Sequence, residues 1–259
     1  MRTVVKLAVC VWFFALAASA EAQTLRVAAA SDLQFAMNDL ADRYEKASGM
    51  KLAVSYGSSG NFRTQIENGA PFDLFFSADV QYPKLLISTG LADPASLYVY
   101  AYGRLVLWAP PGANLRLTQR GLAALKDARI AKIAVANPEH APYGRAAVAV
   151  LQKAGLYDAV KSKLVYGENI SQAAQFAQSG SAQVGILALS LTYADSMKNG
   201  ERWEVPEDLY PPLEQAAVIV HASSNKPAAR AFLDYVKSAD GKAVLAQYGF
   251  TLSGAAHKP

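Results

Sequence analysis

Serine residues follow two short apolar segments at the point where each segment gives way to a helical pattern. Ser31 follows residues 25–30, and Ser58 and Ser59 follow residues 52–56. At a strand-to-helix junction the first backbone N–H groups have no partner within the helix, and the aligned peptide dipoles concentrate positive charge there. A serine adds a hydroxyl donor to those N–H groups. Two such junctions indicate an anion-binding site built from neutral donors.

Each of these serines also has a simpler interpretation. Ser31 alone is equally expected to act only as a helix cap. Residues 57–61, Gly-Ser-Ser-Gly-Asn, are more specific, because a glycine-flanked serine pair can form a nest of convergent N–H groups. This segment lacks the Gly-Lys-Ser/Thr ending of a phosphate-binding P-loop, which disfavours a nucleotide site.

Two later junctions offer the same kind of donor. Residues 137–144 contain two prolines, and Pro142 and Tyr143 stand where the next helix is expected to start. The simpler interpretation is a rigid turn with an exposed tyrosine, and the functional one is a third helix N-terminus with an aromatic lid. Residues 167–171 precede another helical pattern, so that Ile170 and Ser171 offer a fourth set of N–H groups.

The residues that most enzymes and metal sites require do not form recognisable patterns. His140, His221 and His257 are scattered without metal-ligand spacing. There is no Gly-x-Ser-x-Gly motif, and nothing in the sequence pairs a histidine with one of the serines, which disfavours a hydrolase.

The first 22 residues have the pattern of a cleavable signal peptide. Arg2 and Lys6 precede an apolar run over residues 7–17, and small residues follow it. The run is too short for a membrane anchor. Cys10, the only cysteine, lies within this segment behind the bulky Val9, which disfavours a lipid anchor. We therefore expect a periplasmic protein without disulfides or cysteine-based metal sites.

The charge of the chain does not point to nucleic acid. The formal net charge is +4, and removal of Arg2 and Lys6 leaves 23 basic residues against 21 acidic ones. Charges of both signs are interspersed, so that no basic surface is indicated. No second apolar run is long enough to cross a membrane.

Strand-like and helix-like segments alternate along the rest of the chain, which predicts α/β units on mostly parallel sheets. The length favours two domains, although one large α/β domain stays possible. Expected strands include residues 25–30, 52–56, 72–76, 105–108, 133–136, 184–187 and 216–220, and expected helices include residues 32–47, 144–154 and 171–178, with two more near the end of the chain.

Over residues 24–252 the chain resembles the periplasmic molybdate-binding proteins of ABC-type importers. The most specific stretches are Ala-Ala-Ala-Ser at 28–31, Gly-Ser-Ser at 57–59, residues 69–79, residues 137–142 and Gln-Tyr-Gly-Phe at 247–250. The resemblance implies a type II periplasmic binding protein, an α/β fold with two lobes, each a mainly parallel sheet flanked by helices, and a ligand cleft between them. The implied limits are 1–22 for the signal peptide, 23–103 and 214–259 for lobe 1, and 104–213 for lobe 2.

The resemblance also implies which residues hold the ligand. Ser31 and Ser59 correspond to the donors of lobe 1, and Tyr143 and Ile170 to those of lobe 2, with Asp32, Ser58 and Pro142 in support. These groups would bind the oxygens of the oxyanion, and no residue is expected to bind a metal ion directly. Many relatives carry a tyrosine where this chain has Ala188, so we expect Tyr143 to supply the missing hydroxyl.

Asp32 departs from the simplest pattern of the family, because it places an acid beside an anion. Aspartate is favoured at a helix start, where its carboxylate accepts bonds from the first N–H groups. We expect its side chain to turn away from the ligand, onto its own helix, while its backbone N–H points into the cleft.

The resemblance implies a monomeric, non-enzymatic protein without a cofactor that captures molybdate, and tungstate too, for a membrane permease and its ATPase. Neutral donors accept a fully ionised oxyanion, and size then separates molybdate from the smaller sulfate. The main alternative is a binding protein for sulfate or another tetrahedral oxyanion. The effector domain of a transcription regulator is disfavoured by the signal peptide and by the lack of a helix-turn-helix pattern.

Overall fold

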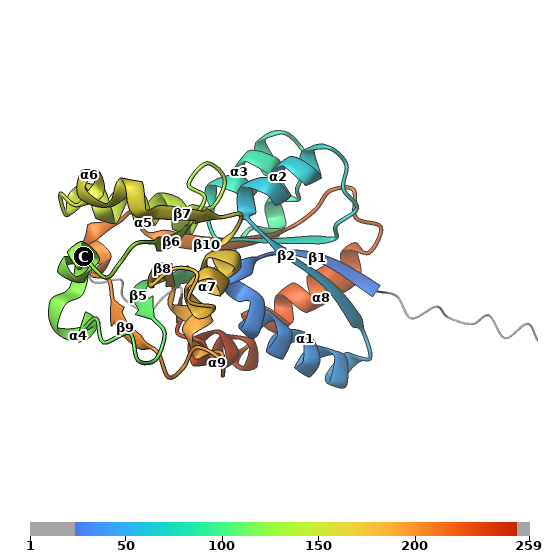
Figure 1. The fold of residues 1–259 in the computed structure, drawn as a ribbon. Coiled ribbons are helices and arrows are strands. Elements are labelled where there is room, and N and C mark those ends of the chain that lie inside the picture. The colour runs from blue at the N-terminus through green and yellow to red at the C-terminus, as the bar shows by residue number, and fades with distance from the viewer. Residues whose placement is uncertain (1–23, 253–259) are drawn as a thin grey trace, which may run out of the picture.

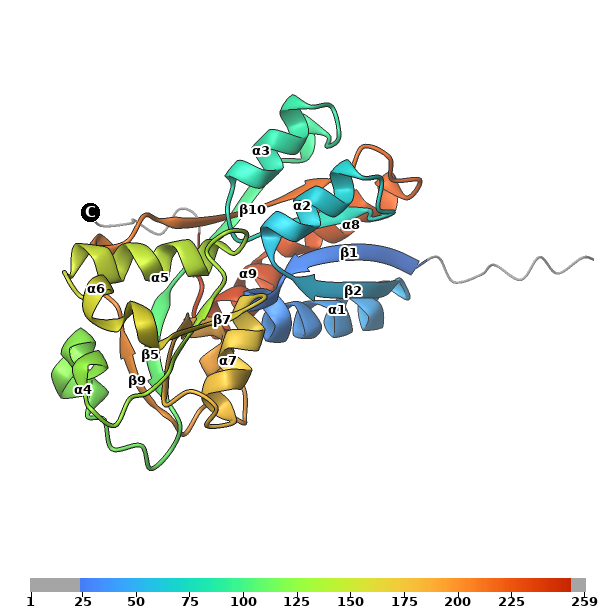
Figure 2. The ribbon, with the colours of Figure 1, turned by 45° about the horizontal axis from the view of Figure 1, so that its top comes forward.

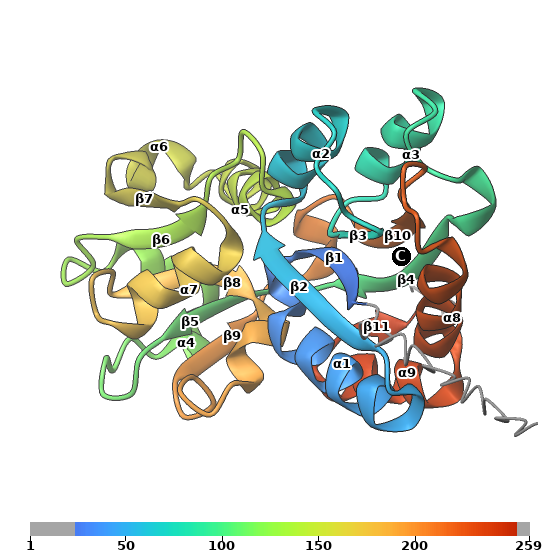
Figure 3. The same cartoon turned by 90° about the vertical axis from the view of Figure 1, so that its right-hand side faces the viewer.

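Two β-sheets lie side by side, each with helices on its faces (Figures 1 and 3). The structure is a computed structural model that describes residues 24–252. The expected two-lobed α/β architecture is confirmed. The predicted signal peptide, with Cys10, lies outside the described residues.

The first sheet contains the strand that leads to Ser31 and the strand that leads to Ser58. β1 pairs in parallel with β2 and β3, and β10 pairs antiparallel with β3 and β4. In spatial order its strands are β11 (Thr251–Leu252), β4 (Tyr98–Gly103), β10 (Leu213–Ile219), β3 (Leu74–Ser77), β1 (Thr24–Ala30) and β2 (Lys51–Gly57).

Alternate residues of the central strands pack on opposite faces of this sheet. Val27 and Ala29 of β1 belong to a core with the helices α1 (Gln34–Ser48), α8 (Lys226–Lys237) and α9 (Ala239–Gln247). Ala28 faces the other way, toward α2 (Ser59–Glu67) and α3 (Gln81–Ser88). Figure 2 shows α1 on one side of β1 and β2 and α2 on the other. Because both faces are covered, these strands are apolar rather than alternating in sequence.

The second sheet forms the core of the other lobe. β6 pairs in parallel with β7 and β8, whereas β5 pairs antiparallel with β8 and β9. Its strands are β7 (Leu164–Gly167), β6 (Ile133–Ala136), β8 (Val184–Ala188), β5 (Leu105–Ala109) and β9 (Glu201–Glu204), and its helices are α4 (Leu117–Arg120), α5 (Pro142–Lys153), α6 (Tyr157–Val160) and α7 (Ile170–Gln178).

Both sheets are mixed, whereas mainly parallel sheets were expected. The difference arises where the chain passes between the sheets. It leaves the first sheet after β4, enters the second at β5, and returns after β9 into β10. The strands on each side of these crossings run antiparallel to their neighbours. The division into lobes at residues 104 and 213 stays a prediction.

Within residues 24–252, no helix is long and apolar enough to cross a membrane. The same part of the chain holds no group of three or more His, Cys, Asp or Glu side chains placed to bind a metal ion.

Candidate oxyanion site

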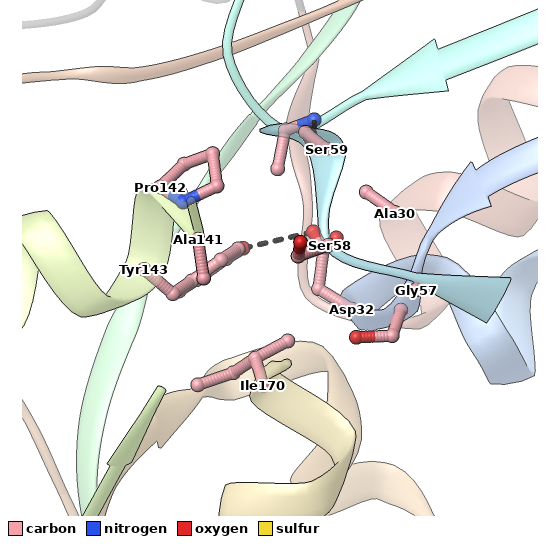
Figure 4. A pocket seen from close by; sticks show the side chains of 11 residues that line it. Ala30, Asp32, Gly57, Ser58, Ser59, Ala141, Pro142, Tyr143 and Ile170 are labelled. Atoms are coloured by element: carbon pink, nitrogen blue, oxygen red, sulfur yellow. Dashed lines mark hydrogen bonds between the residues drawn. The ribbon is translucent and has the colours of Figure 1, made fainter. Parts of the chain in front are cut away.

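Four helix starts, two from each lobe, converge on a small cavity between the lobes (Figure 4). The first lobe contributes the junction of β1 with the short 3-10 helix η1 (Ser31–Leu33) and the junction of β2 with α2. The second lobe contributes the starts of α5 and α7. The cavity is lined by Ala30, Ser31, Asp32, Gly57, Ser58, Ser59, Ala78, Ala141, Pro142, Tyr143 and Ile170. All seven residues that the resemblance assigned to the site therefore line this one cavity.

The start of α2 presents a free donor because its other donors are already used. The Ser58 side chain caps the helix by accepting from Asn61 N, and Gly60 N donates to His140 O at 3.0 Å. Ser59 stands at the first helical position and is fully buried. Its Oγ accepts from Ala78 N at 2.9 Å, which leaves the hydroxyl proton and the Ser59 N–H to a ligand.

The start of α5 has one donor fewer than an ordinary helix. Pro142 occupies its first position and has no N–H. Gly144 N donates back to Ala141 O at 3.0 Å. The N–H of Tyr143 is therefore the donor that α5 directs toward the cavity, which gives Pro142 a supporting role.

The start of α7 is arranged in a similar way. The Asn169 side chain caps the helix by accepting from Gln172 N at 3.0 Å. Ser171 N donates to Ser31 Oγ at 3.4 Å, and Ser171 Oγ donates to Ser31 O at 2.9 Å. Ile170, at the first position, contributes only its backbone N–H, since its side chain is apolar and buried.

Direct hydrogen bonds join the two lobes around the cavity. Ser31 Oγ donates to Asn169 Oδ1 at 3.2 Å, and Asn61 Nδ2 donates to Glu168 Oε1 at 2.6 Å. Gly60 has to be glycine here, because a Cβ at this position would lie 2.7 Å from His140 O. The structure is therefore a closed arrangement of the lobes.

The Asp32 side chain bonds to residues outside its own helix, whereas it was expected to lie on that helix. It lines the cavity, and its Oδ2 accepts from Tyr143 Oη at 3.0 Å (Figure 4). The same oxygen accepts from Gln215 Nε2 at 2.6 Å. The residue before η1, Ala30, makes no side-chain cap hydrogen bond. The carboxylate accepts from Tyr143 of α5, in the second lobe, and from Gln215 of β10, in the first sheet.

The hydroxyl of Tyr143 is occupied by this network. It donates to Asp32 and accepts from Gln215 Nε2 at 3.1 Å. Gly103 leaves room for the network, since a Cβ there would overlap the Tyr143 hydroxyl. The proton of the Tyr143 hydroxyl is directed to Asp32, and the role of this hydroxyl toward the ligand stays a prediction.

Burial dominates the protonation of these groups. Desolvation raises the pKa of Asp32 to about 6, although the hydrogen bonds from Gln215 and Tyr143 oppose the shift. Burial also raises the pKa of Tyr143 and of Tyr100 well above the ordinary value, so that both phenols stay neutral. No lysine or arginine lines the cavity. The site is therefore uncharged apart from Asp32.

Several residues of this network were not predicted from the sequence. Gln215 is fully buried in β10 and also accepts from Tyr100 Oη at 2.8 Å. A glutamine inside an otherwise apolar strand was the signal that could have found it. Asn169 directly precedes a helix, where asparagine is a favoured cap. Ser190, whose Oγ donates to Asp32 O at 2.7 Å, carries no comparable signal.

Two α/β lobes that close over a cavity lined by helix N-termini define the class of two-lobed solute-binding proteins. The pattern of the bacterial extracellular solute-binding proteins matches residues 25–251, and the chain belongs to this family. Over 239 residues it is 44% identical to the molybdate-binding protein of Azotobacter vinelandii, covering 92% of this chain and 93% of the relative. The corresponding protein of Rhodobacter capsulatus is 37% identical over 235 residues, covering 91% of each.

A solved structure agrees with these relatives. The periplasmic molybdate-binding protein of Azotobacter vinelandii superimposes with a TM-score of 0.83 at 34% identity, over 88% of this chain and 99% of that structure. The similarity therefore extends over nearly the whole described fold.

Proposed function

We propose that this chain is a periplasmic binding protein that captures molybdate, and tungstate too, and delivers it to an ABC importer. The observation that carries the proposal is the convergence of four helix starts on a cavity without a lysine or arginine. Free N–H groups and hydroxyls at helix starts suit a compact anion. The relatives described as molybdate-binding proteins support the identity of that anion.

The same donors argue for a fully ionised tetrahedral oxyanion. Each charge-assisted hydrogen bond contributes roughly 1.5–3 kcal/mol, so several neutral donors suffice to hold a dianion. Size then separates molybdate and tungstate from the smaller sulfate. Ser31, Ser59, Tyr143 and Ile170 contact the oxyanion oxygens in this proposal, and no residue binds a metal ion directly.

The proposal includes the partners and state of the protein. A membrane permease and its ATPase receive the ligand, and the protein acts as a monomer without a cofactor or a catalytic role. Export depends on the signal peptide at residues 1–22, which is cleaved. The family, described as extracellular, supports export.

A thermal-shift and calorimetry screen against molybdate, tungstate, sulfate and phosphate tests this function. A ligand that binds only the folded protein adds about 4 kcal/mol of stability at a thousandfold excess over its Kd. For a chain of this size we expect a rise in Tm on the order of 8–16 °C. Molybdate and tungstate should give this rise, and equal concentrations of sulfate and phosphate little or none. An equal response to sulfate would instead indicate the sulfate-binding alternative.

A further inference from the structure

One oxygen of the buried Asp32 carboxyl group has no hydrogen-bond partner among the described residues. Asp32 is 1% exposed, and its Oδ2 accepts both bonds from Tyr143 and Gln215. Its Oδ1 accepts none of the hydrogen bonds in the described part of the chain. A buried polar atom without a partner is destabilising, so that it calls for a specific explanation. Because Asp32 lines the cavity, we take a bound ligand as the partner of Oδ1.

A second buried aspartate shows that this fold can satisfy a structural carboxylate completely. Asp73 is 2% exposed, and its Oδ2 accepts from Arg26 N at 2.8 Å. Its Oδ1 accepts from Ser223 Oγ at 2.7 Å and from Asn225 Nδ2 at 3.4 Å. Both oxygens of Asp73 are thus used, whereas Asp32 keeps one oxygen free at the ligand cavity.

An ionised Asp32 and an oxyanion would repel each other in this cavity. No cationic side chain lines it, and Arg145, in the neighbouring groove, is paired with Asp79 at 2.7 Å. Like charges in a site shielded from water interact strongly. A proton between the two oxygens removes the conflict, because the carboxyl O–H then donates to the oxyanion while Oδ2 keeps both of its donors.

We propose that Asp32 contacts the bound oxyanion through one proton held between Asp32 Oδ1 and a ligand oxygen, so that the site takes up the dianion together with one proton. The proton comes from solvent, and no covalent bond to the oxyanion forms or breaks. This inference rests on the proposed function, since it concerns the form in which the same ligand is held. Asp32 is then a specificity-determining residue rather than only a support.

The free protein is able to take up this proton. Burial raises the pKa of Asp32 to about 6, so that at neutral pH the empty site is largely ionised. A neighbouring dianion raises that pKa further. Between the pKa of Asp32 in the empty site and its higher pKa in the complex, the affinity for the oxyanion falls roughly tenfold for each unit of pH increase. Below about pH 6 the affinity levels off.

Few other titratable groups face Asp32. Tyr143 of α5 and Tyr100 of β4 remain neutral phenols, and Gln215 of β10 does not titrate. Helix α7 and the 3-10 helix η5 (Leu189–Tyr193), which pack against η1, contain no charged residue, and Tyr193 at the end of η5 is exposed.

A histidine near the cavity requires a separate control. His140 Nδ1 lies 2.8 Å from Ser58 Oγ, and its Nε2 lies 3.6 Å from Glu168 Oε1. Because Ser58 lines the cavity, a substitution of His140 serves as the control for Asp32.

Calorimetry of molybdate binding in two buffers of different ionisation enthalpy tests the proposal. At about pH 7.5 we expect the wild-type protein to take up close to one proton per oxyanion, and its affinity to fall roughly tenfold per pH unit above neutrality. In Asp32→Asn the amide nitrogen replaces the carboxyl O–H as a donor, while the amide oxygen still accepts from Tyr143 and Gln215. This variant should take up no proton and lose the pH slope, whereas His140→Gln should keep it.

The outcomes separate this inference from the proposed function. Binding of molybdate without proton uptake overturns the inference and leaves the function intact. A slope that persists in Asp32→Asn, or disappears in His140→Gln, assigns the proton to another group and also overturns it. The wild-type proton count needs no variant, so it decides the matter even if Asp32→Asn fails to fold. If neither molybdate nor tungstate gives any binding heat, the proposed function fails, and this inference fails with it.

Discussion

The two lobes contribute different chemistry to the same cavity. Besides the Ser59 N–H, the first lobe supplies side chains, namely the hydroxyls of Ser31 and Ser59 and the carboxyl group of Asp32. The second lobe supplies backbone N–H groups, from Tyr143 and Ile170, at helix starts whose other donors are already used. Backbone donors are fixed by the path of the chain, whereas side-chain donors change with a single substitution. Substitutions can therefore change the donors of the first lobe, while the backbone donors of the second lobe persist.

The largest effect that distinguishes the two lobes is the pH dependence of stability, because Asp32 of the first lobe titrates. Its folded-state pKa, about 6, lies above the ordinary 3.8, so that the unfolded chain releases this proton first as the pH rises. The stability of the ligand-free protein therefore falls by about 3 kcal/mol between about pH 4 and pH 6. Denaturant unfolding of the wild type and of Asp32→Asn at several pH values measures this loss of stability. Relative to Asp32→Asn, the wild type should show no loss near pH 4 and the full loss near neutrality. Parallel curves would show that Asp32 does not titrate in this range.

Removal of a hydroxyl from the first lobe should weaken binding with the fold intact. We expect Ser59→Ala to lower the affinity for molybdate by roughly 1.5–3 kcal/mol, because the hydroxyl proton of Ser59 is free for the ligand. Ser31→Ala should cost less, since Ser31 Oγ also donates to Asn169. Calorimetry on both variants, with circular dichroism as the control for folding, gives the comparison. Unchanged affinity in both would place the ligand elsewhere.

A methyl group added at Gly60, where the two lobes touch, should hinder their closure. In Gly60→Ala the new Cβ meets His140 O at 2.7 Å, which is closer than real Cβ atoms approach. Closure then requires a backbone shift that costs about 1–3 kcal/mol. We expect weaker molybdate binding by this amount and a more open protein in small-angle scattering with ligand present. Wild-type affinity would show that this contact does not form in the closed complex.

The smallest effect on affinity should come from the second lobe, which contributes backbone N–H groups. Ile170→Val preserves the N–H at the start of α7, so the affinity for molybdate should stay within about twofold. The loss of one buried methylene group lowers the free energy of unfolding by about 0.5–1.5 kcal/mol. Paired calorimetry and denaturant unfolding test both statements. A loss of affinity as large as that of Ser59→Ala would mean that the Ile170 side chain itself shapes the ligand pocket.

The sequence predicted much of this site because its donors depend on local signals. An apolar strand followed by serine, or by a proline at a helix start, marks a junction without reference to the rest of the fold. The Asp32 network could not be predicted in this way. Gln215 is 183 residues from Asp32 along the chain, and Tyr143 is 111 residues away. Local preference indicated a helix cap for Asp32, but two donors from distant strands and helices outweigh that preference. The strand directions next to the crossings between the lobes depend likewise on topology, which apolar runs do not encode.

The absence of lysine and arginine from the lining of the cavity has a consequence for the speed of capture. Clefts lined by cations draw anions in over long distances, and salt slows that association by screening. A cavity whose donors are N–H and O–H dipoles, and whose one charged side chain is the buried Asp32, lacks this long-range attraction. We expect the association rate for the oxyanion to depend little on ionic strength, so that capture continues at nearly the same pace when the salt concentration outside the cell changes.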